Sequence, residues 1–384
     1  MYDCDSRCAL SACPSTARKS GWSAAGMGSG PKAAALLTVC ALCPLLMLLC
    51  KAGAPPATAQ STTLRMSLPI STDSPIGQNI REFARQIEAR TGGAVRIELQ
   101  GGDRRYEEHE VVSAVASGAI EMGATTLNQF AYDVPLAGAF LQPFVFNFDA
   151  LLQAATDRGS EIRALVDDEI LYWTNAHVLW WQPFGSSVIV SKRAPAAHPT
   201  AIAAHAVGAS DDQTREFLRA CGGTPHLVPP PDVLAALTKE TIKAAVTDVM
   251  NVREHGLWQV ADTITNLRHA PSLFLVIINE KAWQSLAPAH REIMSEVGQD
   301  SQSYMWARFA TIRADAYAFA AQKGLRIVEL KPEEVAAWRA CTAPLLEAYV
   351  ERAGDAGPKL FAAYGRLRTE ACCRGVPEAP FLHR

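Results

Sequence analysis

The chain has 384 residues, with 36 lysines and arginines against 39 aspartates and glutamates, which gives a net charge of −3 at pH 7. A nucleic-acid-binding protein needs a basic face, so this balance argues against nucleic acid as a partner. The length is too great for one ordinary hydrophobic core and suits two lobes.

The N-terminus has the pattern of a secretory signal. An unbroken apolar run at 33–50 follows Lys32 and leads into the small residues Ala57-Thr58-Ala59. Such a run followed by small residues is typical of a cleaved signal peptide, so we expect cleavage before Gln60 and a mature protein in the periplasm. The alternative is a retained membrane anchor, because about 18 apolar residues is the lower limit for spanning a bilayer.

Setting aside residues 1–59 changes the charge and cysteine counts. The polar, cysteine-rich part of this segment, 1–26, indicates an over-extended gene start with Met27 as the initiator. The segment holds five of the basic and two of the acidic residues, so 31 basic residues remain against 37 acidic ones, a net charge of −6. Six of the ten cysteines also lie in it. The four that remain are Cys221, Cys341, Cys372 and Cys373. They are too scattered for a disulfide scaffold, and the sequence does not determine how they pair.

Strands and helices alternate from Thr62 onward. A buried strand is predicted at 62–70, followed by a helix whose apolar stripe is Ile76, Ile80, Phe83 and Ile87. Further strands are predicted at 94–100 and 119–127, with a helix at 106–118 between them. This alternation predicts a parallel sheet with crossover helices.

The second part of the chain continues the pattern. We first predict a helical region at 148–169 and two extended segments within 176–192, broken at Pro183-Phe184-Gly185. Two strand–helix units follow, at 205–225 and 226–246. After them we predict a strand beginning at Ser272, a long helix from Pro288 towards Gly324, a strand at 325–330 and a helix at 332–352. The last residues, 354–384, are punctuated by proline, glycine and cysteine, so we expect a tail that wraps the surface.

Several of these stretches resemble one known family. The residues "TGGAVRIELQGGDRRYEEHEVVSAVASGAIEMGATT" (91–126), "FLQPFVF" (140–146) and "FLRACGGTPHLVPPPDVLAAL" (217–237) resemble the dicarboxylate-type periplasmic solute-binding proteins of TRAP transporters. The resemblance covers nearly all of 62–352. It implies an α/β, type II-like periplasmic binding protein with two lobes, an interlobe cleft, hinge strands and a long connecting helix. It also implies a monomer that binds a small organic solute, hands it to membrane subunits, and uses neither cofactor nor metal.

The lobe boundaries follow from the two expected crossings near Gly185 and Ser272. Lobe I is expected at 60–185, with 272–311 returning to it. Lobe II is expected at 186–271, with the helix and strand of 312–353 packing across both lobes. Hinge closure of two such lobes converts solute binding into a shape that a membrane partner can recognise.

The sequence departs from the family where the resemblance places its ligand contacts. The family clamps a carboxylate with arginines, because a guanidinium gives two parallel charge-assisted hydrogen bonds. The alignment puts Val207 and Ser187 at the two arginine positions, and Thr247 at an asparagine position. The resemblance therefore keeps the scaffold but not its usual ligand chemistry, and we expect weak binding of C4 dicarboxylates.

Other polar and aromatic residues are candidates for a less charged ligand. Trp180, Trp181 and Gln182 precede the expected lobe boundary, where Trp181 is a candidate for an aromatic wall of the cleft; the alternative is that at least one tryptophan is core. Ser186, Ser187 and Thr247 are candidate hydrogen-bond donors, or else small residues beside a hinge.

A second group of candidates lies at strand ends and on helices. Asn128 and Gln129 follow an expected strand, at the end where open α/β sheets place ligands, although loop capping is the alternative. Arg253 is the candidate substitute cation, against a solvated helix face. His205 and His255 lack metal-spaced partners, so we read them as surface residues.

Three functions remain open at this level. Transport-linked solute binding is the one favoured by the resemblance. An enzyme is disfavoured because no nucleophile elbow, paired acids or metal-ligand spacing is present. A sensor that hands its ligand to a signalling partner is the third.

Overall fold

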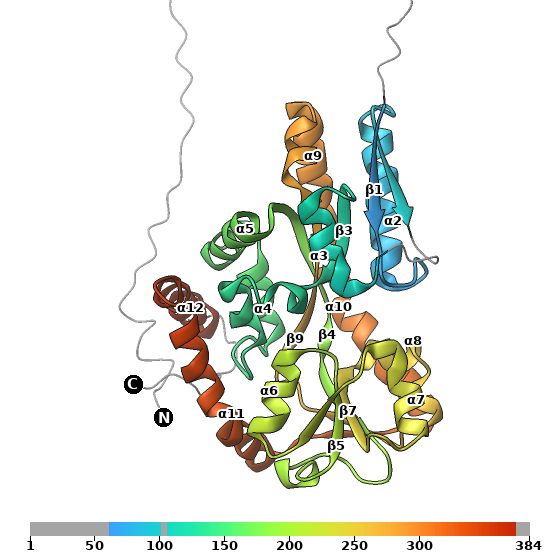
Figure 1. Cartoon of the computed structure of the whole chain (residues 1–384), viewed down its shortest axis with the longest axis vertical. Coiled ribbons are helices and arrows are strands. Elements are labelled where there is room, and N and C mark those ends of the chain that lie inside the picture. The colour runs from blue at the N-terminus through green and yellow to red at the C-terminus, as the bar shows by residue number, and fades with distance from the viewer. Residues whose placement is uncertain (1–60, 101–105, 374–384) are drawn as a thin grey trace, which may run out of the picture. The chain divides into compact units, whose positions relative to one another are not determined.

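The computed structural model describes residues 61–100 and 106–373, with side chains described up to residue 370. The predicted signal peptide, and the part of the expected tail beyond 373, lie outside these residues. Strands and helices form one mixed sheet system with helices on its faces (Figure 1). The strands follow the order β2-β1-β3-β9-β4-β7-β5-β6, with β8 and β10 attached beside β4.

The first half of the sheet contains the N-terminal strands. These are β1 (Thr62–Ser67), β2 (Val95–Gln100) and β3 (Met122–Thr126), all parallel, and β9 (Pro271–Asn279), which is antiparallel to β3. The predicted parallel sheet is therefore correct for β1 to β3, while β9 makes the whole sheet mixed. We call this half-sheet with its covering helices the first half.

The second half of the sheet is built on the C-terminal part of β4 (Ala176–Ser191). β7 (Ala244–Asp248) pairs with it, followed by β5 (Ala206–Ala209) and β6 (Thr224–Leu227). The other side of β4 pairs with β8 (Thr263–Asn266), which in turn pairs with β10 (Arg326–Glu329). We call this half-sheet with its helices the second half.

Strand β4 belongs to both halves. Its first part pairs with β9 and its last part with β7 and β8, and the register shifts between Pro183 and Gly185. The two extended segments predicted here are thus one strand with an irregularity at the predicted break. Gly185 lies opposite Ser272 in the pairing of β4 with β9, the two strands from which the expected crossings were drawn. The lobe limits themselves stay a prediction.

Helices cover both faces of each half. Their bounds are α2 (Pro75–Arg90), α3 (Glu108–Ser117), α4 (Asp149–Thr156), α5 (Glu161–Thr174), α6 (Asp212–Ala220), α7 (Val233–Thr238), α8 (Val249–Glu254), α9 (Glu280–Ser285), α10 (Pro288–Gln322), α11 (Pro332–Arg352) and α12 (Ala356–Cys373). The stripe predicted for α2 is buried as expected, from Ile76 to Ile87. The long helix α10 packs on α2, β4 and α8, and so contacts both halves.

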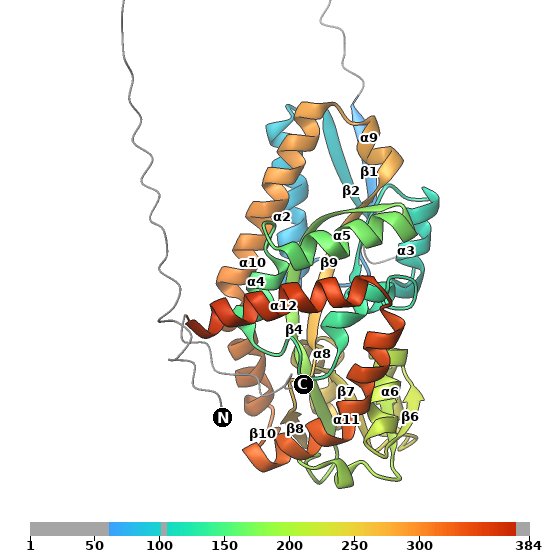
Figure 2. The same ribbon diagram turned by 90° about the vertical axis from the view of Figure 1, so that its left-hand side faces the viewer.

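The expected surface tail is instead partly a helix. α12 lies across α4 and α5 (Figure 2) and buries Leu360, Ala363 and Tyr364 in the core of the first half. Leu360, Tyr364 and Leu367 recur at helical spacing, which the proline, glycine and cysteine content of the segment concealed. A disulfide joins Cys221, at the end of α6, to Cys341 in α11.

Candidate functional site

The ends of β3 and β5 meet where the two halves face each other. Asn128 lies in the 3₁₀ turn after β3, and its Nδ2 donates to Oδ2 of Asp211 at 2.8 Å. Asp211 is the N-cap of α6 and also accepts from the backbone N–H of Thr214. The predicted site residue Asn128 is therefore placed at the interface of the halves, and its amide holds them together there.

A second carboxylate lies beside this contact. The N–H of Thr126 donates to Oε1 of Glu108, the first residue of α3, at 3.3 Å. Burial raises the pKa of Glu108, and the negative charge of Asp211 raises it further. Within the described residues no lysine or arginine forms an ion pair with either carboxylate. Neither acid was recognised in the sequence, because only the topology brings α3 and α6 to one place.

The positions expected for cations are neutral and buried. Val207 is fully buried in a cluster that includes Phe217 and Trp338. Ser187 is buried too, and its hydroxyl lies 2.6 Å from Nδ1 of His269. Burial lowers the pKa of His269 to about 3, so this imidazole is neutral at physiological pH. The placement of Val207 and Ser187 argues against a direct charged contact with a ligand.

The two tryptophans of β4 face opposite sides of the sheet, and both are core residues. Trp180 packs on Phe83, with ring centroids 4.4 Å apart. Trp181 is also fully buried, and its ring lies 5.2 Å from that of Phe140. Because helices cover both faces of the first half, neither ring is left to form a cleft wall.

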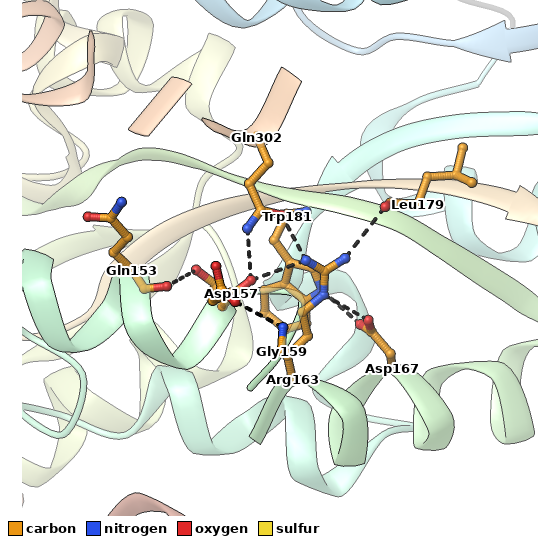
Figure 3. A network of polar contacts seen from close by, with 9 residues as sticks. Gln153, Asp157, Gly159, Arg163, Asp167, Leu179, Trp181 and Gln302 are labelled. Carbon is orange, nitrogen blue, oxygen red and sulfur yellow. Dashed lines mark hydrogen bonds and ion pairs between the residues drawn. The ribbon is translucent and has the colours of Figure 1, made fainter. Parts of the chain in front are cut away.

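A polar network also holds Trp181 in place (Figure 3). Its indole N–H donates to Oδ1 of Asp167 at 2.7 Å, and its backbone N–H donates to Oε1 of Gln302 at 3.1 Å. Arg163 bridges the same groups, donating to Asp167 at 3.0 Å and to Gln302 at 2.8 Å. Gln182 is likewise buried, with Oε1 accepting from Asn79 at 2.9 Å. These contacts support a structural role for the predicted aromatic site.

Two predicted site residues, Ser186 and Thr247, lie near a buried carboxylate. Asp248 at the end of β7 is 3 % exposed, and its Oδ1 accepts from the N–H of Met250 at 2.9 Å. Burial raises its pKa to about 6. A Cβ added to Gly185 would overlap this carboxylate, so any other residue there requires the Asp248 side chain to move. Ser186 is half-buried beside it, and Thr247 accepts from Nδ2 of Asn251 at 3.1 Å.

A groove of about 1130 Å³ lies between α2, α8 and α10. Phe184, Met250 and Phe309 give it an apolar part, and Asp300 and Asp315 an acidic one. Of the predicted site residues, Arg253 alone lines this groove. It is exposed, and its guanidinium lies 5.0 Å from the centroid of the Phe319 ring. The structure thus separates Arg253 from the strand-end candidates rather than gathering them around one ligand.

Two further features bear on the class of protein. In the part of the chain that the structure describes, no group of His, Cys, Asp and Glu side chains is arranged to hold a metal, and His205 is exposed. The same part contains no helix that is both long and apolar enough to cross a membrane.

The fold is the mixed α/β architecture of TRAP solute-binding protein structures, which have two lobes. A family model described as bacterial extracellular solute-binding protein, family 7, matches residues 66–353, and the chain belongs to this family. The resemblance drawn from the sequence is thereby confirmed. The family is one of solute-binding receptors rather than enzymes.

Curated relatives and solved structures agree with this assignment. The C4-dicarboxylate-binding periplasmic protein DctP of Rhodobacter capsulatus is 23 % identical over 310 residues, which are 78 % of this chain and 90 % of the relative. The structure of DctP7, a Bordetella pertussis extracytoplasmic solute receptor binding pyroglutamic acid, has a TM-score of 0.74 at 20 % identity and covers 79 % of this chain and 100 % of that one. A TRAP periplasmic solute-binding protein from Chromohalobacter salexigens with bound D-glucuronate has a TM-score of 0.73 at 18 % identity, over 79 % and 98 % of the two chains.

Proposed function

We propose that this chain is the extracytoplasmic receptor of a TRAP-type transporter and delivers a small organic solute to its membrane subunits. Membership of family 7 and the likeness to TRAP receptors support this proposal. We further propose export by the signal at 1–59 and a monomeric mature chain beginning at Gln60. N-terminal sequencing of the exported protein tests the cleavage, and a sequence that retains residues 33–50 would contradict it.

The ligand is expected to differ from that of the dicarboxylate-binding relatives. The observation that carries this proposal is the neutral chemistry at the two expected cation positions, where Val207 is in the core and Ser187 bonds to a neutral His269. Glu108 and Asp211 place two acidic side chains at the neighbouring strand ends, and no lysine or arginine of the described residues forms an ion pair with either. A carboxylate enclosed without a partner is strongly disfavoured. We therefore propose a ligand that is uncharged or weakly charged, held by hydroxyl and amide groups.

Calorimetry of the mature chain tests this proposal. Each lost charge-assisted hydrogen bond removes roughly 1.5–3 kcal/mol, so succinate, malate and fumarate are expected to bind about one to two orders of magnitude more weakly for each bond. Native mass spectrometry of the purified protein identifies any solute that it carries, and that solute serves as the positive control.

The variant Arg253→Ala separates two readings of a positive result. Submicromolar succinate binding that survives this substitution would show that the cleft holds carboxylates without Arg253, and the proposed ligand chemistry would be wrong. Binding that is lost in Arg253→Ala would instead assign the anchoring charge to the groove between α2, α8 and α10. Absence of binding by any solute carried or tested would contradict the receptor function itself.

A further inference from the structure

The first part of α11 is anchored to the second half. Trp338 is fully buried there, its ring stacks on that of Phe217 at 5.5 Å, and its indole N–H donates to the carbonyl of Ala197 at 3.0 Å. One turn later the disulfide joins Cys341 to Cys221 at the end of α6. Covalent and aromatic contacts thus fix this part of α11 to α6 and its surroundings.

The last part of α11 is anchored to the first half. Tyr349 is 3 % exposed and belongs to the hydrophobic core of the first half, as does Ala353. The following helix extends the anchor, because the hydroxyl of Tyr364 in α12 donates to the carbonyl of Val145 at 3.0 Å, and its ring meets Phe146 edge-on at 5.1 Å. One helix therefore has its two ends in two different cores.

The change of core occurs directly after a proline. Leu345 packs against the core cluster of the second half, and Leu346 packs against that of the first half. Pro344 lies inside the helix just before them, and it is exposed. Proline has no N–H, so the carbonyl of Ala340 lacks its intrahelical donor, and the ring disfavours straight helix at this point. The helix is weakest where its two anchors meet.

We infer that α11 is a jointed strut between the two halves, which bends at Pro344 when they move and which the Cys221–Cys341 disulfide holds to the second half. This inference rests on the proposed function, since solute binding by hinge closure requires the halves to move. An unbroken helix with both ends fixed would resist that movement, whereas a joint between the anchors allows it. The hydrogen bond between Asn128 and Asp211 bridges the halves at another place, so removing it should make their movement easier.

Hydrogen–deuterium exchange of the ligand-free mature chain tests the joint. In the natural protein the amides of 345–348 are expected to exchange faster than those of the turns on either side. Pro344→Ala restores the missing donor, and we expect exchange of this stretch to slow about fivefold, the factor that about 1 kcal/mol of hydrogen bonding gives. Pro332→Ala is the matched control, since Pro332 is also exposed and occupies the first turn of the same helix, where proline costs nothing.

Two further variants test the anchors and the coupling. Cys221→Ser/Cys341→Ser should speed exchange in 333–343 and leave α12 unchanged, because α12 is held by the other half. Asn128→Ala should speed exchange at 345–348 in the natural background and have a smaller effect in the Pro344→Ala background. Equal exchange on both sides of Pro344, or no response to Asn128→Ala, would overturn the inference. A uniform rise of the exchange rate across the whole chain in the cysteine variant would also overturn the inference, because the disulfide would then stabilise the fold in general rather than hold α11 in particular. None of these measurements uses a ligand, so a failure of the proposed solute binding would show separately in the calorimetry.

Discussion

We expect the buried carboxylate of Asp248, beside Gly185 of β4, to make the stability of the fold depend on pH. Its Oδ1 accepts from the N–H of Met250, and the side chain is almost completely buried. Burial raises the pKa of Asp248 from 3.8 to about 6. An acid with a raised folded-state pKa binds more protons when folded than when unfolded between these two values. The destabilisation that Asp248 causes therefore decreases as the pH falls through about 6, and the free energy of unfolding stops changing on its account below pH 3.8.

The substitution Asp248→Asn removes this pH dependence with little change of shape. Because the pKa rises from 3.8 to about 6, the ionised carboxylate costs about 3 kcal/mol at high pH, and most of this cost is recovered between pH 8 and pH 4. We expect the variant to be more stable than the natural protein by up to about 3 kcal/mol at pH 8 and nearly equal to it at pH 4.

Urea unfolding at pH 4, 6 and 8, followed by tryptophan fluorescence, measures this difference. His269 titrates in the opposite sense, since burial lowers its pKa to about 3, but it is present in both chains and cancels. Asp315→Asn on the exposed face of α10 is the control, and its effect should stay within about 0.5 kcal/mol at each pH. The reasoning is refuted if the Asp248→Asn curve runs parallel to that of the natural protein, or if the variant is less stable at pH 8.

Two other substitutions probe the same strand. Gly185→Ala should destabilise the fold by about 1–3 kcal/mol in thermal unfolding, because the new Cβ overlaps the Asp248 carboxylate. The double variant Gly185→Ala/Asp248→Ala should recover most of this loss. If the effects of the two substitutions simply add, the two residues do not collide. Trp181→Phe loses the 2.7 Å bond to Asp167 and should cost about 1–3 kcal/mol of stability while leaving solute affinity unchanged in calorimetry; a loss of affinity with unchanged stability would instead place Trp181 at the ligand.

Regular patterns in the sequence predicted the regular parts of the fold. The stripe from Ile76 to Ile87 predicted α2, and the punctuation by Pro332 predicted the start of α11, because periodicity and capping are local properties. α12 escaped prediction, since turn-forming residues outweighed its apolar positions and tertiary packing decided the outcome.

The site was less accessible from the sequence, because its parts are assembled by topology. Alternation along β4 predicts that Trp180 and Trp181 face opposite sides, but only the structure shows that both sides are covered. The contact between Asn128 and Asp211 joins residues 83 positions apart, and no local pattern links them. The disulfide spans 120 residues and could not be deduced for the same reason.

Val207 of β5, the neutral residue at an expected cation position, packs in the same hydrophobic cluster as the first part of α11. Val207, Phe217, Cys221 and Trp338 pack together in it, so the residue that stands at an expected cation position also supports the anchor of α11. A charged side chain at position 207 would have to place its charge inside this cluster, where desolvation costs several kcal/mol without a partner. We therefore expect a single arginine at position 207 to disturb the packing around the first part of α11 rather than to recreate a carboxylate clamp.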